Sequence, residues 1–417
     1  MNKTKTVIVG AGFGGIEVAK CLKKANTDVI LIDMMNHHLF QPLLYQVATA
    51  TLSPSDIAVP VRQILAKQKN ASFIMGKVVK VDKDKNEIVL EDGLKLPFDY
   101  LVLAPGATHS YFGKDEWETF APGVKTLQDA ILIRDKILLA FEHAERAKTK
   151  EERQRFLRFA IVGGGPTGVE LAGAIAEIAY KSRNKNFRNI SSEAVEIHLL
   201  EGANNILPAF PETLGKKAQA QLEKLGVKVR TKTFVTNITE KGVTLGSEFL
   251  DVPNVIWAAG NMASPLLKTL STELDKQGRA IVGSDLAIPE HANIFVIGDA
   301  ASCTGKDGKP YPGLAPVAKQ EAKLVAKIIK NEIPKERRPV FSYHDKGSLA
   351  TIGKGKAVGL IGPLKLSGFF AWFIWCFVHI MYLIDFRNRF FVLMQWLFLF
   401  ISGKHTNDHI ITPYKHK

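Results

Sequence analysis

The segment Thr6-Val-Ile-Val-Gly-Ala-Gly-Phe-Gly-Gly15 joins a short run of β-branched residues to a glycine-rich turn. A helix-like stretch follows to about Ala25, and a second strand-like run, Val29–Ile32, ends on Asp33. The order of strand, GxGxxG turn, helix, strand and acid is the fingerprint of a βαβ unit that binds a dinucleotide. The acid lies 18 residues after the last glycine of the turn.

The glycines of this turn have separate mechanical tasks. Gly10 permits the tight turn, Gly12 lets the backbone approach a pyrophosphate, and Gly15 lets the helix pack closely on the strand. The helix N-terminus then faces the phosphates, and the Asp33 carboxylate accepts hydrogen bonds from ribose hydroxyls. A single GxGxxG motif is weak evidence, because many glycine-rich turns bind nothing.

The fingerprint returns 153 residues later. Phe159-Ala-Ile-Val-Gly-Gly-Gly-Pro-Thr-Gly168 leads into a helix predicted from about Val169, and a strand predicted over Val195–Leu200 ends on Glu201. This acid follows the last glycine by 33 residues, so we expect an insertion in the second crossover, at the polar and basic segment Lys181–Ser192. The repeat predicts an α/β fold with two Rossmann-like dinucleotide-binding domains.

Further strands support the repeat. Asp99–Gly106 and Asn254–Gly260 are apolar runs that both stop at a glycine. A third run, Asn293–Ala300, ends in Gly-Asp and is followed by a loop and a helix predicted over Ala315–Lys330. We assign this third segment to the first nucleotide, although Asp299 could instead cap a helix.

The acid of the second fingerprint indicates which nucleotide binds there. A carboxylate at the end of the second strand favours a free ribose 2′-hydroxyl and repels a 2′-phosphate. Glu201 is followed by Gly-Ala-Asn, which offers no basic side chain to hold such a phosphate. The second site is therefore predicted to prefer NADH over NADPH.

The composition is that of a globular chain of two or three domains, with 417 residues, 46% of them hydrophobic and 23% charged. The net charge is +14, and no nucleic-acid-binding motif accompanies it. No Ser-His-Asp grouping or metal-spaced His/Cys cluster is visible, so we predict neither a hydrolase nor a metal site. The start of the chain enters a strand without a long apolar run, so we expect no signal peptide and a cytoplasmic core.

Residues 368–401 are a second unusual feature, because 27 of these 34 positions are apolar and 13 are aromatic. The helix-like runs Gly368–Ile384 and Phe390–Ile401 have 17 and 12 residues, short of the roughly 20 needed to span a bilayer. The polar segment Asp385–Arg389 separates them. We expect two amphipathic helices in the membrane interface; a buried helix pair or a homodimer contact is the alternative.

Aromatic and basic side chains suit such an interface. Tryptophan and tyrosine are expected at the headgroup level; they are Trp372, Trp375, Tyr382 and Trp396. Basic side chains are expected to meet anionic lipid; they include Arg387, Arg389, Lys404 and Lys415.

With these motifs the chain resembles the two-dinucleotide-binding-domain flavoproteins, the glutathione-reductase-like fold, over residues 1 to about 340. The resemblance implies a discontinuous FAD domain at 1–110 and 285–340, an NADH domain at 111–284 and a C-terminal membrane-association region at 341–417. It implies FAD contacts from Gly10, Gly12, Phe13, Gly14, Gly15, Asp33, His38, Pro42, Val78, Gly106, Gly298, Asp299, Ala300, Pro316 and Val317. The implied NADH contacts are Gly163, Gly165, Pro166, Thr167, Gly168, Glu201 and Gly260.

Cysteines divide the chemistry of this superfamily, because thiol-based members need a reactive thiolate beside the flavin. Cys21, Cys303 and Cys376 have no partner at redox spacing. This disfavours disulfide reductases and the sulfide:quinone reductases, which have a similar fold.

Two segments narrow the resemblance to type II NADH:quinone oxidoreductases. They are His37-His-Leu-Phe-Gln-Pro-Leu-Leu-Tyr-Gln-Val-Ala48, with Leu52-Ser-Pro54 beyond it, and Gly368-Phe-Phe-Ala-Trp-Phe-Ile-Trp375 leading to Asp385–Arg389. The resemblance implies a single-subunit respiratory enzyme that uses FAD to oxidise NADH and reduces a membrane quinone, menaquinone or ubiquinone, without pumping protons. It also implies a peripheral, monotopic protein on the cytoplasmic face of the cell membrane, and a homodimer is possible.

The resemblance names two catalytic candidates. Glu170, two residues after Gly168, would lie beside the flavin in nicotinamide or quinone handling, although an acid also suits the positive end of a helix dipole. Gln320 matches the later glutamine of a family motif on the Ala315–Lys330 helix. Pro316 stands where many members have the first glutamine, and proline has no side-chain hydrogen bond to offer a quinone carbonyl.

Two further functions remain open. One is a soluble NADH-dependent flavin reductase for a protein electron carrier, and the other is a non-catalytic NADH-sensing flavoprotein whose tail binds a partner. The apolar tail argues against the first.

Overall fold

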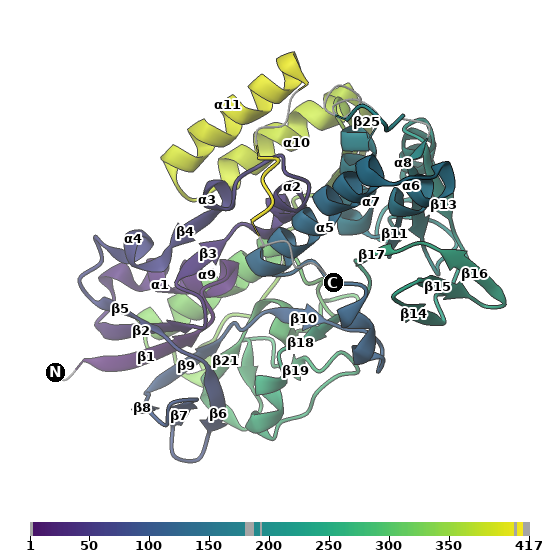
Figure 1. Cartoon of the computed structure of the whole chain (residues 1–417). Coiled ribbons are helices and arrows are strands. Elements are labelled where there is room, and N and C mark those ends of the chain that lie inside the picture. Colours follow the sequence, from purple (N-terminus) through teal and green to yellow (C-terminus); the bar gives the residue numbers. More distant parts are fainter. Residues whose placement is uncertain (1–2, 180–186, 192–193, 404–406, 412–417) are drawn as a thin grey trace. The chain divides into compact units, whose positions relative to one another are not determined.

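The computed structural model describes residues 3–179, 187–191, 194–403 and 407–411 (Figure 1). The chain forms two compact units. The first comprises Met1–Leu39, Ala58–Thr108 and Asn261–Asp345, and the second comprises Phe40–Ile57, His109–Gly260 and Lys346–Lys417. Residues 181–186 and 192 of the expected insertion, and Lys404 and Lys415, lie outside the described residues.

The first unit is built on a six-stranded sheet of order β20-β21-β9-β1-β2-β5. All its strand pairs are parallel except β20 with β21. The strands are β1 (Thr4–Val9), β2 (Thr27–Asp33), β5 (Ala71–Met75), β9 (Tyr100–Leu103), β20 (Ala287–Ile288) and β21 (His291–Val296). Buried strand residues such as Val7, Ile8 and Leu101 form near-continuous apolar runs, as expected for a parallel sheet covered on both faces.

Helices α1 (Phe13–Cys21) and α9 (Ala315–Lys330) pack on each other beside this sheet. Gly14 lets α1 approach Ile297, the residue after β21, because a Cβ on Gly14 would be 2.9 Å from Ile297 Cδ1. An antiparallel sheet of β6 (Val78–Asp82), β7 (Glu87–Leu90) and β8 (Lys95–Pro97) also belongs to this unit.

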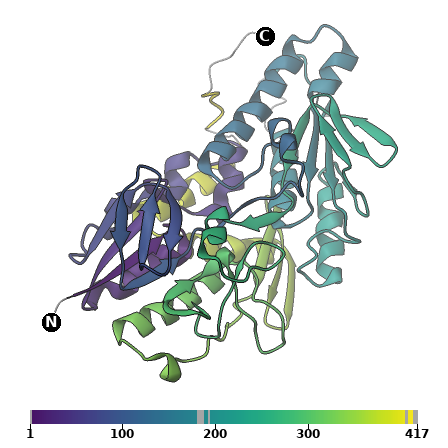
Figure 2. The ribbon, with the colours of Figure 1, turned by 90° about the horizontal axis from the view of Figure 1, so that it is seen from below.

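The second unit repeats this design with a four-stranded parallel sheet of order β13-β12-β11-β17. Its strands are β11 (Arg158–Val162), β12 (Glu196–Leu200), β13 (Val227–Arg230) and β17 (Asn254–Trp257). Its helices include α5 (Leu127–Arg146), α6 (Lys150–Phe156), α7 (Pro166–Glu177) and α8 (Glu212–Glu223). In both views the antiparallel meander β14 (Asn237–Thr239), β15 (Gly242–Leu245) and β16 (Glu248–Asp251) projects at one end of this unit (Figures 1 and 2).

The C-terminal part of the second unit packs on α7. It consists of the antiparallel strands β23 (Ser348–Gly353), β24 (Lys356–Ile361) and β25 (Leu364–Gly368), and the helices α10 (Phe369–Tyr382) and α11 (Phe386–Ser402). Gly173 makes the contact possible, because a Cβ there would lie 1.9 Å from the carbonyl oxygen of Ile352 on β23. Helices α10 and α11 lie side by side (Figure 1).

A short segment from early in the sequence joins this part. It contains α2 (Leu44–Ala48), which packs on α5 and α7, and α3 (Pro54–Ile57), which packs on α11. Asn388 of α11 donates its side-chain amide to the carbonyl oxygens of Ser55 (3.2 Å) and Asp56 (2.9 Å). The α11 helix is therefore held to residues more than 300 positions away.

Most predicted elements are confirmed, but several boundaries differ. Helix α1, predicted to reach about Ala25, ends at Cys21, and a 3-10 turn continues to Lys24. Helix α7 begins at Pro166, because proline suits the first helical turn, and not at about Val169. Helix α11 begins at Phe386, so the polar segment before Phe390 is not a linker: Asp385 accepts a hydrogen bond from the Arg387 backbone N–H (3.2 Å) and caps the helix.

The compact units do not divide the chain where the predicted domains do. The unit that holds the second fingerprint ends its middle segment at Gly260, and Asn261–Asp345 belongs to the first unit. The predicted end of the NADH domain at residue 284 stays a prediction. Among the described residues, no helix is both long enough and apolar enough to cross a membrane.

One pair of substitutions tests the packing of the second turn. A Cβ at Gly168 would lie 1.8 Å from the Gly163 carbonyl oxygen, whereas a Cβ at Gly165 would meet no atom within 4 Å. We expect Gly168→Ala to lower the melting temperature by several degrees, because helix and strand must separate. Gly165→Ala, the matched control, should leave the melting temperature of the ligand-free protein within about 1 °C. Equal melting temperatures for the two variants would contradict this account.

Candidate functional site

The first glycine-rich turn has the geometry of a phosphate cradle. Gly10 has φ +103°, and its N–H donates to the Ile32 carbonyl oxygen (2.7 Å). A Cβ on Gly10 would lie 2.1 Å from the Ala104 carbonyl oxygen, and one on Gly15 would lie 1.8 Å from the Gly10 carbonyl oxygen. A Cβ on Gly12 would meet nothing within 4 Å, so the backbone there is open to a ligand.

Asp33 is bound into the same turn. Its carboxylate accepts hydrogen bonds from the backbone N–H groups of Ala11 (2.6 Å) and Met35 (2.7 Å). Burial raises the pKa of Asp33, and these two N–H groups oppose that rise. The carboxylate keeps further lone pairs for hydroxyl donors, so the residues present fit the ribose and pyrophosphate of a dinucleotide.

The second turn repeats these contacts almost atom for atom. The Gly163 N–H donates to the Leu200 carbonyl oxygen (2.8 Å), and Gly163 has φ +111°. Glu201 accepts from the backbone N–H groups of Gly164 (2.5 Å) and Ala203 (2.7 Å). Two independent copies of one hydrogen-bond pattern support the prediction of two nucleotide sites.

Other predicted FAD contacts of the first unit lie in three places. His38 is buried; its Nδ1 is 2.8 Å from the Ala11 carbonyl oxygen, and its Nε2 is a buried atom without a protein partner. Burial lowers the pKa of His38 to about 4, so its imidazole is neutral at pH 7. Val78 is the buried first residue of β6, and Gly106 has φ +72°.

The Gly298–Ala300 segment forms a single 3-10 turn after β21. Asp299 does not cap α9, whose N-cap residue is Leu314. Glu321, which the sequence motifs did not single out, accepts the Gly298 N–H (2.6 Å), and burial raises the pKa of Glu321 to about 7. Pro316 lies in the first turn of α9, as expected, and Val317 is buried.

The two catalytic candidates lie in different units. Gln320 on α9 exchanges two hydrogen bonds with the His344 backbone: its Nε2 donates to the carbonyl oxygen and its Oε1 accepts from the N–H, both at 2.9 Å. Glu170 lies on α7 in the second unit. Pro42, a predicted FAD contact, also belongs to the second unit, where it lies in a 3-10 turn. Gln320 does not line the pocket that contains Glu170.

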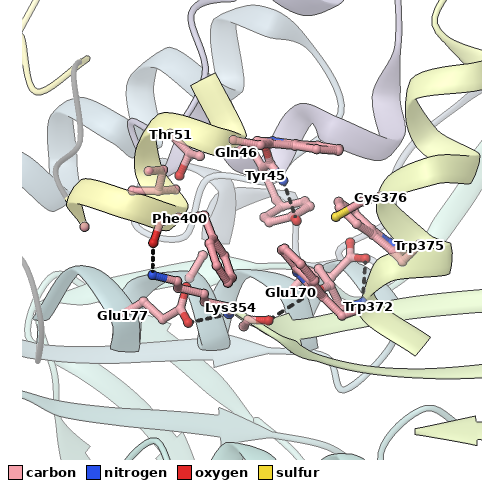
Figure 3. Close-up of a pocket in the computed structure, with 16 residues that line it drawn as sticks. Tyr45, Gln46, Thr51, Glu170, Glu177, Lys354, Trp372, Trp375, Cys376 and Phe400 are labelled. Atoms are coloured by element: carbon pink, nitrogen blue, oxygen red, sulfur yellow. Dashed lines mark hydrogen bonds between the residues drawn. The ribbon is translucent and has the colours of Figure 1, made fainter. Parts of the chain in front are cut away.

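That pocket lies wholly within the second unit, between α2, α7, β23, α10 and α11 (Figure 3). It has a volume of about 870 Å³, part of it open to solvent. Its wall combines carboxyl, amine, hydroxyl and amide groups with indole and phenyl rings: Tyr45, Gln46, Thr51, Glu170, Ala174, Glu177, Thr351, Gly353, Lys354, Trp372, Trp375, Cys376, Trp396, Leu399, Phe400 and Gly403.

Three of these residues follow one face of α7. Glu170, Ala174 and Glu177 are four and three positions apart, which is the spacing of side chains stacked along a helix. The Thr351 N–H donates to Glu170 Oε1 (3.4 Å), and removal from water by the surrounding wall raises the pKa of Glu170 to about 8. Glu170 is therefore mostly protonated at pH 7.

Lys354 lies at the other end of this acidic face. Its backbone N–H donates to Glu177 Oε1 (2.5 Å), and its Nζ donates to the Phe400 carbonyl oxygen (2.5 Å) near the end of α11. The same Nζ lies 4.4 Å from the centre of the Phe400 ring. The tip of the β23–β24 turn is thereby tied to α7 and α11.

The three tryptophans expected at the lipid headgroup level, Trp372, Trp375 and Trp396, all line the pocket. Trp375 is 2% exposed, because this side of α10 packs against the body of the unit. Trp396 of α11 donates its Nε1–H to Gln46 Oε1 (2.7 Å), and Gln46 Nε2 donates to the Tyr45 hydroxyl oxygen (2.9 Å). Tyr45 and Gln46 lie within the His37–Ala48 motif, but no feature of that motif identifies them as pocket residues.

The cysteines are ill suited to thiol chemistry. Burial raises the pKa of Cys303 to about 11 and that of Cys376 to about 12, and it also raises the pKa of Cys21. A thiol with so high a pKa is a poor nucleophile at pH 7. Within the described residues, no group of three His, Cys, Asp or Glu side chains is placed to hold a metal ion.

Comparisons with known proteins agree with this geometry. The family model of pyridine nucleotide-disulphide oxidoreductases matches residues 4–322, and that of the NDH2 C-terminal domain matches residues 345–405. The type II NADH:quinone oxidoreductase Ndh of Mycobacterium tuberculosis is 43% identical, over 97% of this chain and 89% of that protein. A type II NADH:quinone oxidoreductase of Staphylococcus aureus is 30% identical, over 88% of this chain and 92% of that protein.

Solved structures share the fold. NDH2 from Plasmodium falciparum, in complex with NADH, aligns with a TM-score of 0.88 at 23% identity, covering 95% of this chain and 98% of that chain. The sulfide:quinone oxidoreductase of Aquifex aeolicus aligns with a TM-score of 0.73 at 17% identity, covering 93% and 91%. At these identities the likeness concerns the fold alone.

Two tandem dinucleotide-binding motifs, each closed by a carboxylate, define the class of two-dinucleotide-binding-domain oxidoreductases. Two findings narrow this class: the sequence identity with type II NADH:quinone oxidoreductases extends across nearly the whole chain, and the C-terminal domain matches as well. The chain belongs to the type II NADH:quinone oxidoreductase family.

A substitution at Glu201 tests the nucleotide preference. We expect Glu201→Gln to reduce the ratio of kcat/KM for NADH to that for NADPH about tenfold, because a charged acceptor for the 2′-hydroxyl and a repulsion against the 2′-phosphate are both lost. The measurement is steady-state kinetics with both nucleotides. Asp251→Asn, at an acid outside the turn, is the control; an unchanged ratio in the Glu201 variant would contradict the role of its charge.

Proposed function

We propose that this protein catalyses the oxidation of NADH by a quinone through bound FAD. The doubled turn geometry, the family membership and the pocket around Glu170 support the proposal; the pocket is the observation that carries the quinone step. FAD would occupy the turn of Gly10–Gly15 and Asp33, and NADH that of Gly163–Gly168 and Glu201. We assign the FAD contacts to residues 1–110 and 285–340 and the NADH contacts to residues 111–284.

When bound, FAD would accept a hydride from NADH and pass two electrons to a second substrate. The protein's own task is to bind both nucleotides, exclude competing chemistry and manage protons. Because the thiols are unreactive, the flavin carries the electrons. His38 contacts the first glycine-rich turn through Ala11 and, being neutral, adds no charge there.

The pocket suits a quinone ring. Aromatic and aliphatic side chains provide flat apolar surface, and a small number of polar groups converge on the same space, as in most ligand sites. Two of its walls are α10 and α11, whose outward faces expose large apolar side chains, so a lipid-dissolved substrate has an apolar approach.

Glu170 can supply a proton to this substrate. Quinone becomes quinol by taking up two electrons and two protons, while NADH releases a hydride and becomes NAD⁺, so one further proton comes from the medium. A carboxyl group with a pKa of about 8 holds a proton at pH 7 and can release it to a quinone oxygen as charge develops there. Gln320 remains a predicted quinone contact.

We propose that α10 and α11 bind the surface of an anionic membrane. Phe369, Phe373 and Phe377 on α10 are each more than half exposed, as are Phe386 and Phe390 on α11. Exposure on this scale disfavours the alternative of a buried helix pair and marks an interaction surface. We further propose that the protein attaches peripherally to the cytoplasmic face of the cell membrane. The quinone it reduces is menaquinone or ubiquinone. A homodimer contact is a second use of the same exposed surface.

Two half-reactions test the function. Rapid mixing with NADH should bleach the flavin absorbance, and subsequent mixing with a short-chain quinone should restore it. Failure of every quinone, with reoxidation by a ferredoxin-type protein instead, would favour a soluble flavin reductase.

The role of Glu170 predicts a pH profile. As the pH rises through about 8, Glu170 loses its proton and the quinone half-reaction should slow, because its acid form is the donor. Glu170→Gln cannot donate this proton, so we expect a lower rate at pH 7, by about 10- to 100-fold, and no decline near pH 8. FAD content should stay that of the wild type. Wild-type rates and profile in this variant would refute the assignment.

Membrane binding is tested by replacing exposed rings. Phe373→Ser with Phe377→Ser should weaken sedimentation with anionic phosphatidylglycerol vesicles at least tenfold, because each buried phenyl group contributes about 2 kcal/mol. Activity with a water-soluble quinone should persist. Phe249→Ser, at an exposed ring on β16, is the matched control. Unchanged vesicle binding in the double variant would argue for another use of the surface.

A further inference from the structure

We propose that Tyr45 donates a hydrogen bond to a carbonyl oxygen of the quinone, and that Gln46 and Trp396 hold its hydroxyl in the donating orientation. The inference deepens the proposed function and rests on it, because it takes the pocket to be the quinone site. The indole of Trp396 sets the direction of this hydrogen-bond chain, because its N–H can only donate, whereas the Gln46 amide and the Tyr45 hydroxyl can each donate or accept.

The Trp396 contact determines the orientation of the Gln46 amide. An indole Nε1–H can only donate, and it lies 2.7 Å from Gln46 Oε1, so the oxygen of the amide must face Trp396. The –NH₂ end of Gln46 then faces Tyr45, and Gln46 Nε2 lies 2.9 Å from the phenol oxygen. Gln46 is 6% exposed, so water competes little for either end of the amide.

This orientation fixes the role of Tyr45 in turn. An amide –NH₂ group can only donate, so the phenol oxygen is the acceptor in this hydrogen bond, and its own hydrogen must point elsewhere. The hydroxyl oxygen lies at the pocket wall, where Tyr45 faces Glu170 across the space drawn in Figure 3. A group that accepts one hydrogen bond and presents its hydrogen to a pocket is a donor for whatever binds there.

Tyr45 keeps this hydrogen over the working pH range. Burial, and after it the charge of Glu170, raise the pKa of Tyr45 well above its usual value of about 10. The side chain is 6% exposed, which limits its rotation and pre-organises the donor. A quinone carbonyl is an acceptor only, and it becomes more negative as electrons arrive, so a fixed O–H group stabilises the reduced oxygen more than the oxidised one.

The same chain of hydrogen bonds links the membrane-facing helix to the pocket. Trp396 belongs to α11, and its ring packs on Trp375 of α10 with centroids 5.3 Å apart. The position of α11 therefore determines whether the Gln46 amide keeps its observed orientation. Gln46 and Trp396 are positioning residues, and Tyr45 is the group that would contact the substrate.

Tyr45→Phe in the full-length holoenzyme removes the donor and keeps the ring. We expect flavin reoxidation by a short-chain quinone to slow about 10- to 100-fold, whereas FAD content and flavin reduction by NADH stay at wild-type values. Tyr111→Phe is the matched control: Tyr111 is also a buried tyrosine of the second unit, but its hydroxyl donates to the Ala121 carbonyl oxygen (2.9 Å), away from the pocket. It should leave quinone reoxidation unchanged.

Gln46→Glu tests the orientation itself. A carboxylate at this position still accepts from Trp396 but has no hydrogen for Tyr45, so the Tyr45 hydroxyl should turn to donate to it. We expect Gln46→Glu to slow flavin reoxidation by quinone as Tyr45→Phe does. The double variant Tyr45→Phe with Gln46→Glu should be reoxidised no more slowly than either single variant. Trp396→Phe leaves the amide free to rotate and should give a smaller, few-fold loss in the same half-reaction.

The outcomes separate this inference from the function on which it rests. If the reduced wild-type flavin reacts with no quinone, the proposed function fails. If wild-type reoxidation by quinone is fast and Tyr45→Phe matches it, the inference fails and the function stands. Equal losses in both half-reactions, or multiplying losses in the double variant, would assign these residues a structural role and overturn the inference.

Discussion

The close approach of a helix to a strand through two facing glycines is the constraint on which both nucleotide-binding motifs depend. In each unit, the last glycine of the turn lies so near the carbonyl oxygen of the first that a Cβ would be 1.8 Å from it. Because no side chain fits between them, only glycine lets the helix begin this close to the strand. The free N–H groups of the first helical turn then face outward from the glycine-rich turn. The acid of the second strand can then reach two backbone N–H groups of the same loop.

The second unit extends this constraint into a second kind of site. Helix α7, set by Gly168 at its beginning, carries Gly173 one turn and a half further on, and there the β23 backbone packs against it. The pocket forms where α7 leaves the sheet and meets β23, α10 and α11. The nucleotide motif and the pocket thus share one helix: its first turn belongs to the motif, and the face of Glu170, Ala174 and Glu177 lines the pocket.

The sequence allowed the nucleotide-binding parts to be predicted well, because they rest on local patterns. Strand periodicity, glycine spacing and the position of an acid are all contained in about 30 consecutive residues, and the helix Ala315–Lys330 was predicted to the residue. The pocket could not be predicted in this way. Gln46 and Trp396 are 350 positions apart, and neither residue type at either position indicates a hydrogen bond with the other.

The C-terminal helices show the same division. Their apolar character and their inability to span a bilayer follow from composition, but which rings face outward depends on contacts with α3 and β24 that no local pattern encodes. Trp375 and Trp396 therefore belong to the interior and to the pocket, although their residue type suits a lipid headgroup region. The start of α11 was missed because the polar run Asp385–Arg389 resembles a break between two helices, although aspartate is a common N-cap residue.

The shared helix α7 has a consequence for inhibition. Because a rigid helix moves as a body, a molecule that wedges into the pocket and tilts α7 would displace the glycine turn at its other end. Thermodynamic linkage makes such an effect reciprocal, so a nucleotide that fixes α7 would in turn alter the affinity of that molecule. Competition between inhibitor and nucleotide in steady-state kinetics would then report strain in one helix rather than overlap of two binding sites.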